Sequence, residues 1–518
     1  MMNRKTHGAI AAGHPKTAQA GQIMFELGGN AFDGAIAAML ASFVVESTLT
    51  SPAGGGFLLA HTQDKKSMLF DFFCQTPRLK KSIEEIDFYP VSLNFGGAIQ
   101  MFHIGRGSVA IPGSLMGLFE VHQKLGKLPF SVVIEPAINY ARHGYEITPY
   151  NRVTFEILEP ILRASHESQK LYLSNDKLLS IGERGYLKDF ANVLEELAKK
   201  GIQEFYQGDI AQQMLQDMKE GGYLIKEDLV NYRVIKRKPL KINYRGYELL
   251  TNPPPSSGGI LINYALKLLE TVDVNCFNFG SNKHLQLLAT VMALTNDARK
   301  INYDNYVYEE NIIEQFLSHK NLLDSQNNLQ KVINKWGSTT HISVIDEDGN
   351  AASVTNSNGE GSSYVIPNTG IMLNNMLGEA DLNPLGFHRW RCDCRISSMM
   401  SPTLILKDGK PEIVLGSGGS NRIRTALLQV ISNLLDFDFS LEEAINQPRV
   451  HWENNLFNVE PREQLETLEN LKLPPETETI LWQELSMFFG GVHGVRFKDD
   501  HSLEATGDIR RAGVGIVC

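Results

Sequence analysis

Several features that often reveal the class of a protein are scarce in this sequence. The cysteines are few and odd in number, which argues for a reduced compartment: Cys74, Cys276, Cys392, Cys394 and Cys518. The pair at 392 and 394 lacks a second Cys/His pair nearby, so ordinary packing explains it better than a metal site. The longest apolar run, Ala35 to Val45, is far shorter than the roughly 20 residues of a membrane helix. We therefore expect no membrane partner.

The sequence also lacks an excess of positive charge. Lys and Arg number 49 against 59 Asp and Glu, and the formal net charge of −10 is spread without long blocks of one sign. This balance argues against nucleic acid or an anionic membrane surface as a partner. The first residues lead into Gly8 without an apolar signal core, so we expect a cytoplasmic protein. Metal-ligand spacing and a Gly-x-Ser-x-Gly elbow are both missing, so we expect no metal, no cofactor and no conventional serine hydrolase.

What is present points to one large fold. With 518 residues, 42% of them hydrophobic, the chain can bury a large core, and no repeat or Pro-rich linker divides it. Residues 8–62 predict a strand, two helices, a glycine loop and a strand. The first helix spans Thr17 to Leu27, and the second, Phe32 to Val45, is apolar nearly all round and should be buried. The glycine loop, Gly54 to Gly56, predicts tight backbone packing, because no Lys-Ser/Thr follows it.

The most informative stretch is a predicted hairpin within residues 337–357. Small hydroxyl residues come first, alternating β-branched positions follow, and Asp348-Gly349 is a strong hairpin-turn signal. A two-residue turn there sets Thr339 opposite Asn358, with Ser357 as its diagonal neighbour. The hairpin would then gather three hydroxyl groups at its open end, those of Thr339, Thr340 and Ser357.

These hydroxyls allow two interpretations from the residues alone. Thr and Ser are common at the edges of strands and need no function there. Alternatively, Thr339 becomes a new amino terminus, whose free α-amine serves as general base when its own hydroxyl attacks an acyl carbon. Thr339-Thr340-His341, the Asp-Gly turn and Leu373-Asn374-Asn375 resemble the small-subunit start of the γ-glutamyltransferases. That family consists of autoprocessing N-terminal-nucleophile hydrolases, and the resemblance spans about residues 8–515.

The resemblance implies a fold and a processing reaction. The fold would be α+β, a four-layer αββα sandwich formed jointly by two fragments of one interleaved domain. Cleavage between Ser338 and Thr339 would give a large subunit, 1–338, and a small catalytic subunit, 339–518, which remain together as a heterodimer. We expect residues 318–338, which are polar, to form a flexible segment leading to the scissile bond. Thr339 would be the nucleophile, Thr340 and Ser357 would orient it, and His341 would be structural.

A glycine turn predicts an oxyanion site. Gly418 and Gly419 precede a predicted helix from Ile423 to Leu434, and backbone N–H groups at a helix start stabilise developing negative charge. A nucleotide-binding turn is the alternative, but the full strand–GxGxxG–helix pattern is missing. The Gly-Gly-Ser sequence also matches the family.

Substrate-binding positions carry over only in part. Glu379 falls where relatives hold the α-amine of the γ-glutamyl donor, and Glu360 is a looser candidate for the same task. Ser397 and Ser398 match two serines that bind the donor carboxylate. Phe73, however, stands where the family has the arginine that grips this carboxylate, and Met376 stands where relatives often have Gln. The arginines that could compensate are Arg78, Arg391 and Arg395.

The sequence therefore predicts a threonine amidohydrolase or acyltransferase acting on small amides or peptides. γ-Glutamyl amides such as glutathione are the first hypothesis, with water or an amine as acyl acceptor. An acylase of the same mechanism with a less polar acyl group is the second, favoured by Phe73 and Met376. The third is an uncleaved, inactive binding homologue. Ser256 and Ser257 are expected only to cap a helix from Gly259 to Leu269.

Overall fold

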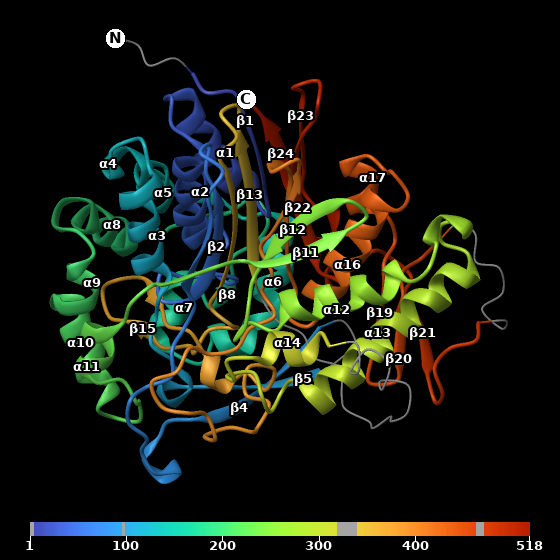
Figure 1. Cartoon of the computed structure of the whole chain (residues 1–518). Coiled ribbons are helices and arrows are strands. Elements are labelled where there is room, and N and C mark those ends of the chain that lie inside the picture. Colours follow the sequence, from blue (N-terminus) through green and yellow to red (C-terminus); the bar gives the residue numbers. More distant parts are fainter. Residues whose placement is uncertain (1–4, 96–98, 319–338, 463–470) are drawn as a thin grey trace.

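The computed structural model describes residues 5–95, 99–318, 339–462 and 471–518, so most of the expected flexible segment, with Ser338, lies outside the described residues. Two β-sheets pack face to face, with helices on both outer faces (Figure 1). The first sheet runs β10 (Ile235–Arg237), β3 (Ser67–Phe72), β2 (Gly55–His61), β14 (Ala351–Ser357), β13 (Thr340–Asp346), β1 (Gly8–Ala12) and β24 (Val514–Val517). This sheet therefore combines strands from both sides of Thr339, with β14 and β13 lying between β2 and β1.

The second sheet and the helices complete the four layers. Its strands are β11 (Leu240–Tyr244), β12 (Tyr247–Thr251), β17 (Thr403–Lys407), β18 (Lys410–Gly418), β22 (Gly491–Phe497) and β23 (Leu503–Thr506). The first sheet is covered by α1 (Pro15–Glu26), α2 (Ala31–Val45) and α3 (Ser114–Leu125). The second is covered by α12 (Gly258–Glu270), α16 (Arg422–Leu435) and α17 (Leu441–Asn446), with α13 (Asn282–Asn302) packed on α12.

Shorter elements surround this sandwich. The remaining helices are α4 (Phe130–Val133), α5 (Glu135–His143), α6 (Pro149–Leu162), α7 (His166–Tyr172), α8 (Lys188–Lys200), α9 (Gln203–Gln207), α10 (Asp209–Met218), α11 (Lys226–Asn231) and α14 (Ile312–Phe316). The remaining strands are β4 (Tyr89–Asn94), β5 (Ile99–Ile104), β6 (Tyr145–Glu146), β7 (Leu173–Ser174), β8 (Lys177–Leu178), β9 (Arg184–Gly185), β15 (Val365–Ile366), β16 (Ile371–Met372), β19 (Val450–Glu453), β20 (Leu456–Val459) and β21 (Glu478–Leu481). None of the helices in the described ranges combines the length and apolar character needed to cross a membrane.

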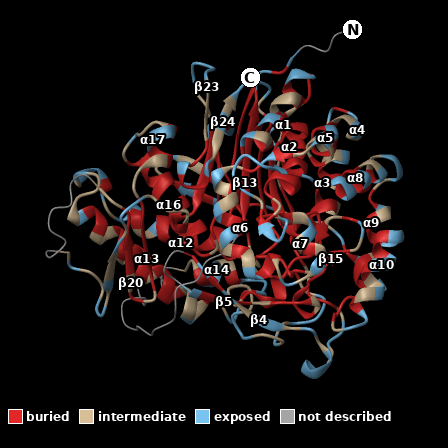
Figure 2. Cartoon of the chain, turned by 180° about the vertical axis from the view of Figure 1, so that it is seen from behind, coloured by how far each residue is buried: buried red, intermediate tan, exposed pale blue. Residues whose placement is uncertain are grey.

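The two predicted amino-terminal helices are confirmed as α1 and α2. Every residue of α2 is buried, as its all-round apolar sequence predicts, and Figure 2 shows α2 and β13 inside the molecule. Asn30 caps α2 by accepting hydrogen bonds from the backbone N–H groups of Phe32 and Asp33. The helices approach closely at Gly21, where a Cβ atom would lie 3.0 Å from the carbonyl oxygen of Gly34. This packing fixes the outer layer against β13 and β14.

The central hairpin exists, but its predicted register is wrong by one residue. Thr340 pairs with Asn356, not with Ser357, because the turn between β13 and β14 holds one more residue than a two-residue turn. Gly349 adopts a φ of 83°, as the left-handed position of such a longer turn requires. The register, continued by one residue, sets Thr339 directly opposite Ser357. The correction thus brings the two hydroxyl residues closer than the sequence predicted.

Asp346 holds this turn and ties it to α2. Its buried carboxylate accepts hydrogen bonds from the backbone N–H groups of Asp348 (3.1 Å) and Asn350 (3.0 Å) within the turn. A further bond comes from the N–H of Ala31 at the start of α2, at 2.9 Å. The turn is therefore set by a side chain that also joins the hairpin to the helix layer.

We predict that Asp346→Ala lowers the free energy of unfolding by about 2 kcal/mol or more, because it leaves buried N–H groups without acceptors. Urea denaturation measures the loss. The control is Asp348→Ala in the same turn, whose exposed side chain should change stability by about 0.5 kcal/mol at most. Equal effects of the two substitutions would contradict this role of Asp346.

Candidate active site

One small pocket brings together several of the residues that the sequence singled out. Its lining includes Thr339, Ser357, Glu379 and Ser398 from three separate stretches of the chain. Gly418 lies against the backbone of Thr339 so closely that a Cβ atom there would overlap the Thr339 carbonyl oxygen. The pocket measures about 30 Å³ as it stands, room for about two water molecules.

The hairpin and the strand beside it place Thr339 and Ser357. Ser357 ends β14, and its Oγ accepts a hydrogen bond from the N–H of Gly359 at 3.0 Å. The predicted tight packing of the glycine loop is confirmed here: a side chain on Gly54 would overlap the Ser357 carbonyl oxygen, and β2 pairs with β14 along its length. The loop thus brings β2 against the end of β14 that carries Ser357.

Thr340 turns away from this pocket toward a buried carboxylate that the sequence analysis missed. Its Oγ1 donates a 2.6 Å hydrogen bond to Glu46 Oε2, and Thr17 Oγ1 donates to Glu46 Oε1 at the same distance. Burial raises the pKa of Glu46, whereas these hydrogen bonds and the nearby charge of Arg511 act in the opposite direction. The available sequence signal was a single acidic residue directly after an all-apolar helix.

Arg511 is a second residue that the sequence analysis missed. Its Nη1 donates a 3.2 Å hydrogen bond to the carbonyl oxygen of Thr339, although the two residues are far apart in the sequence. Both side chains are buried. The backbone of Thr339 is thus held between Arg511 and Gly418.

His341 has a structural environment, in line with its prediction. Nδ1 lies 2.8 Å from Thr355 Oγ1 and Nε2 lies 2.9 Å from Ser343 Oγ, so both ring nitrogens have partners. Complete burial lowers the pKa of this imidazole well below its usual value. It is a neutral cross-strand link below the pocket.

The predicted glycine turn lies at the start of α16, as expected. Gly418 ends β18, and Gly419 has a φ of 122°, a conformation in which a side chain would be strained. A Cβ atom on Gly419 would also lie only 2.9 Å from Gly490 Cα. Backbone N–H groups at this end of a helix favour negative charge.

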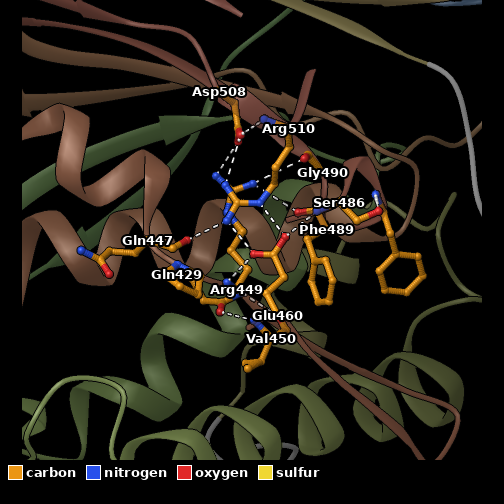
Figure 3. Close-up of polar contacts among 12 residues, drawn as sticks. Gln429, Gln447, Arg449, Val450, Glu460, Ser486, Phe489, Gly490, Asp508 and Arg510 are labelled. Atoms are coloured by element: carbon orange, nitrogen blue, oxygen red, sulfur yellow. Dashed lines mark hydrogen bonds and ion pairs between the residues drawn. The ribbon is translucent and has the colours of Figure 1, made fainter. Parts of the chain in front are cut away.

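A buried ion-pair network holds the segment of Phe489 and Gly490, which packs against the glycine turn (Figure 3). Arg449 Nη1 donates to the carbonyl oxygens of Phe489 and Gly490, the segment against which Gly419 packs. Arg449 also pairs with Asp508 at 2.6 Å, and Arg510 pairs with both Asp508 and Glu460. Because a buried charge is costly unless it is paired, these contacts fix the position of the supporting segment.

The pocket is acidic on one side. Glu379 is buried, and within the described residues its Oε1 has no hydrogen-bond partner. Burial, followed by the charges of Glu360 and Asp381, raises the pKa of Glu379 well above its usual value. Asp381 also lines the pocket and accepts a 2.5 Å hydrogen bond from Ser420 Oγ beside the glycine turn. This side of the pocket suits a cationic or hydrogen-bond-donating group.

The opposite wall is apolar where the family resemblance leads one to expect a cation. Phe73 lines the pocket and stacks on Phe57, with ring centroids 5.4 Å apart. Arg395 lies behind this wall, where its guanidinium pairs with Asp71 at 3.2 Å. The other two candidates do not line the pocket either: Arg78 pairs with Asp393, and Arg391 is exposed over the ring of Tyr308.

The two adjacent serines face different surroundings. Ser398 lines the pocket, whereas the Oγ of Ser397 lies 3.0 Å from Ser257 Oγ. The expectation that Ser256 and Ser257 cap the next helix is wrong, because no side chain caps α12. Ser256 Oγ instead donates to the carbonyl oxygens of Ser398 and Met400, and Ser257 Oγ contacts Ser397, so this pair anchors the segment that carries the two serines. In the described part of the chain, no group of three His, Cys, Asp or Glu side chains could hold a metal ion.

Comparisons with known proteins agree with this arrangement. The family model described as Gamma-glutamyltranspeptidase matches residues 17–518. The glutathione hydrolase proenzyme of Escherichia coli K12 is 30% identical over 481 residues, which cover 86% of this chain and 81% of that protein. The acylase ACY 1 proenzyme of Pseudomonas sp. SE83 is 30% identical over 472 residues, 88% of this chain and 84% of that protein.

A solved structure supports the fold. The cephalosporin acylase from Bacillus halodurans superposes with a TM-score of 0.84 at 24% identity, covering 99% of this chain and 96% of that one. This likeness and the layers described above confirm the predicted αββα sandwich. From the family match and the two identities, the chain belongs to the gamma-glutamyltranspeptidase family of hydrolases and transpeptidases.

Proposed function

We propose that this chain is the precursor of a threonine amidohydrolase that cleaves itself before Thr339 and then acts on small amides. The observation that carries the proposal is the meeting of Thr339 and Ser357 in one pocket whose far side is acidic, with Gly418 packed against the backbone of Thr339. In processing, Thr339 Oγ attacks the carbonyl carbon of Ser338, the peptide nitrogen leaves, and water hydrolyses the resulting ester. The products are fragments 1–338 and 339–518, which stay together because their strands share one sheet.

The freed α-amine of Thr339 then takes the proton of its own hydroxyl as Oγ attacks a substrate amide. The N–H groups of Gly418 and Gly419, at the start of α16, hold the oxyanion. The amine half of the substrate leaves, and water or another amine receives the acyl group. Arg511 supports this role, because a cation on the Thr339 carbonyl disfavours the ammonium form of the adjacent α-amine and so keeps it available as a base.

The acidic side of the pocket determines which acyl group fits best. An ammonium group is attracted to the Asp381 carboxylate and favours ionisation of Glu379 beside it, as the α-amine of a γ-glutamyl group would. An α-carboxylate finds no arginine beside it, since Phe73 forms that wall and Arg395 is paired with Asp71. We therefore infer an acyl group that carries an amine and does not need a carboxylate; γ-glutamyl amides such as glutathione are included.

A second candidate is an acylase for apolar acyl groups. It is favoured by the side chains that form the rest of the pocket, Phe73, Met376, Leu382, Met399 and Met400. Methionine side chains are flexible, so they can open the small pocket for a larger group.

The first prediction concerns processing. Purified wild-type protein should give two bands on a denaturing gel, and Edman sequencing of the smaller fragment should read Thr-Thr-His-Ile-Ser. Thr339→Ala should give one full-length band, because the attacking hydroxyl is gone, whereas Thr339→Ser should still cleave. Normal cleavage of Thr339→Ala, or an active enzyme that is a single intact chain, would contradict the mechanism.

The second prediction concerns the acyl group, tested with four 4-nitroanilides that differ in two charged groups. γ-Glutamyl carries amine and carboxylate, 4-aminobutyryl the amine alone, glutaryl the carboxylate alone, and butyryl neither. We expect kcat/KM for the 4-aminobutyryl anilide to match or exceed that for the γ-glutamyl anilide. The kcat/KM for the glutaryl anilide should be at least about tenfold lower than that for the γ-glutamyl anilide, because acidic side chains line the pocket. Fastest turnover of butyryl would establish the second candidate. A tenfold preference for γ-glutamyl over 4-aminobutyryl would contradict the inferred indifference to the carboxylate.

The third prediction concerns pH. The pKa of Glu379 is raised in the folded state, so the folded chain keeps a proton that the unfolded chain loses as the pH rises above about 4.5. The free energy of unfolding should therefore fall as the pH rises from about 4.5 to the raised pKa. Glu379→Gln should make this decrease smaller and raise the Tm at pH 7. Thermal unfolding between pH 4 and 8 measures the difference, with the exposed Glu84→Gln as control. Parallel pH profiles for wild type and Glu379→Gln would show that Glu379 is not buried in this way.

A further inference from the structure

A second, larger cavity lies next to the Thr339 pocket. It measures about 80 Å³ and is lined in part by Tyr308, Leu382, Arg389, Trp390, Arg391 and Ser397. We call it the outer cavity. Leu382 lines both cavities, and the successive residues Ser397 and Ser398 line one cavity each. A substrate whose carbonyl carbon lies at Thr339 therefore needs to extend only past Leu382 to reach the outer cavity.

The charge of the outer cavity is opposite to that of the Thr339 pocket. Arg389 and Arg391 both line it and are exposed, and neither forms an ion pair with a carboxylate of the described residues. The one acidic side chain in the lining, Asp304, is neutralised by Arg299, whose Nε lies 2.9 Å from Asp304 Oδ1. Within the described ranges, the two cations of this cavity thus have no carboxylate partner, whereas the pocket beside it is lined by the carboxyl groups of Glu379 and Asp381.

The walls of the outer cavity are largely apolar and carry two aromatic rings. Tyr308 is held by a hydrogen bond from its hydroxyl group to the carbonyl oxygen of Arg395, at 3.0 Å. Trp390 packs edge-on against Tyr223, with ring centroids 5.4 Å apart. The guanidinium of Arg391 lies over the Tyr308 ring, 5.4 Å from its centroid, so this cation is held at an aromatic surface.

We propose that the outer cavity binds the amine half of the substrate, and that this half is a flat, ring-bearing amine with a carboxylate. The apolar walls and the two rings accept the ring, and Arg389 and Arg391 accept the carboxylate. The same cavity would receive an acceptor amine of this kind in acyl transfer. This inference rests on the proposed function of Thr339, and it adds the chemical class of the leaving group.

The opposed charges also orient the substrate. An amide with a cationic acyl group and an anionic amine half is attracted to the site in only one direction, with its carbonyl between the two cavities. The reversed orientation would bring its ammonium group to Arg389 and Arg391 and its carboxylate to Asp381, where like charges repel.

Binding of the amine half alone tests the proposal without any catalysis. The probes are 3-aminobenzoate and 3-aminobenzamide, which have the same ring and amine and differ in the carboxylate. In ligand-observed NMR titrations of purified wild-type protein, the Kd for 3-aminobenzoate should be at least about fivefold lower than the Kd for 3-aminobenzamide. The double variant Arg389→Ala/Arg391→Ala should remove this preference, Arg389→Lys/Arg391→Lys should keep most of it, and Arg184→Ala, an exposed arginine on β9, should leave it unchanged. Equal affinities in wild type, or a preference that survives the double alanine variant, would overturn the proposal.

Turnover separates this inference from the proposed function. The two amines are coupled to the best acyl group of the anilide series, and kcat/KM is measured for both amides. We expect the carboxylated amide to be preferred about fivefold or more, and the double alanine variant to lose this preference through a higher KM for the carboxylated amide. If neither amide is hydrolysed, the proposed function fails, and the NMR titration still decides whether the outer cavity recognises an aromatic carboxylate.

Discussion

The site depends on how the backbone of Thr339 and Thr340 is held. Thr340 donates its hydroxyl to Glu46, a carboxylate that lies in the interior at the end of α2, and Arg511 donates to the Thr339 carbonyl from the other end of the chain. Burying a carboxylate or a guanidinium costs free energy unless the group is hydrogen-bonded. Loss of either hydrogen bond to the hairpin would therefore lower the stability of the fold. The position of Thr339 therefore depends on two distant parts of the sandwich, the end of α2 and the last residues of the chain.

Around this fixed point the site is divided by charge. Glu379, Glu360 and Asp381 make the inner side acidic, the start of α16 with Gly418 and Gly419 favours negative charge at the reacting carbonyl, and the outer cavity ends in arginines. These regions would attract the successive parts of an amide: the acyl group, the oxyanion and the amine half. The apolar wall at Phe73 is consistent with the proposed acyl group, because a cation at this position would repel its amine.

The family relationship leaves the substrate open, and the lining of the site narrows the choice. The chain is equally close to a glutathione hydrolase proenzyme and to an acylase proenzyme, at 30% identity each. Phe73 and the methionines of the pocket move it away from recognition of a γ-glutamyl carboxylate. In the proposed function Glu379 would still bind an amine, so the proposed acyl group is that of neither a glutathione hydrolase nor an apolar acylase.

Local patterns in the sequence were sufficient to predict several helices and strands. The apolar run before Glu46 predicted a buried helix, the glycines at 418 and 419 predicted a turn into α16, and the alternation after Thr339 predicted the hairpin, because helix and strand periodicity are local properties. The register of the hairpin was wrong, since Asp346 stabilises a longer turn by contacts that include α2. Ser256 and Ser257 were predicted to be helix caps but anchor the segment of Ser397 and Ser398, which is distant in sequence, and Arg395, a candidate for the pocket, is paired with Asp71. The sequence by itself determined the helices, the glycine turn and the hairpin named here, and it supplied most of the candidate residues of the site. Only the tertiary structure decided which of those residues meet, because burial and pairing of charges between distant segments fix where each side chain can lie.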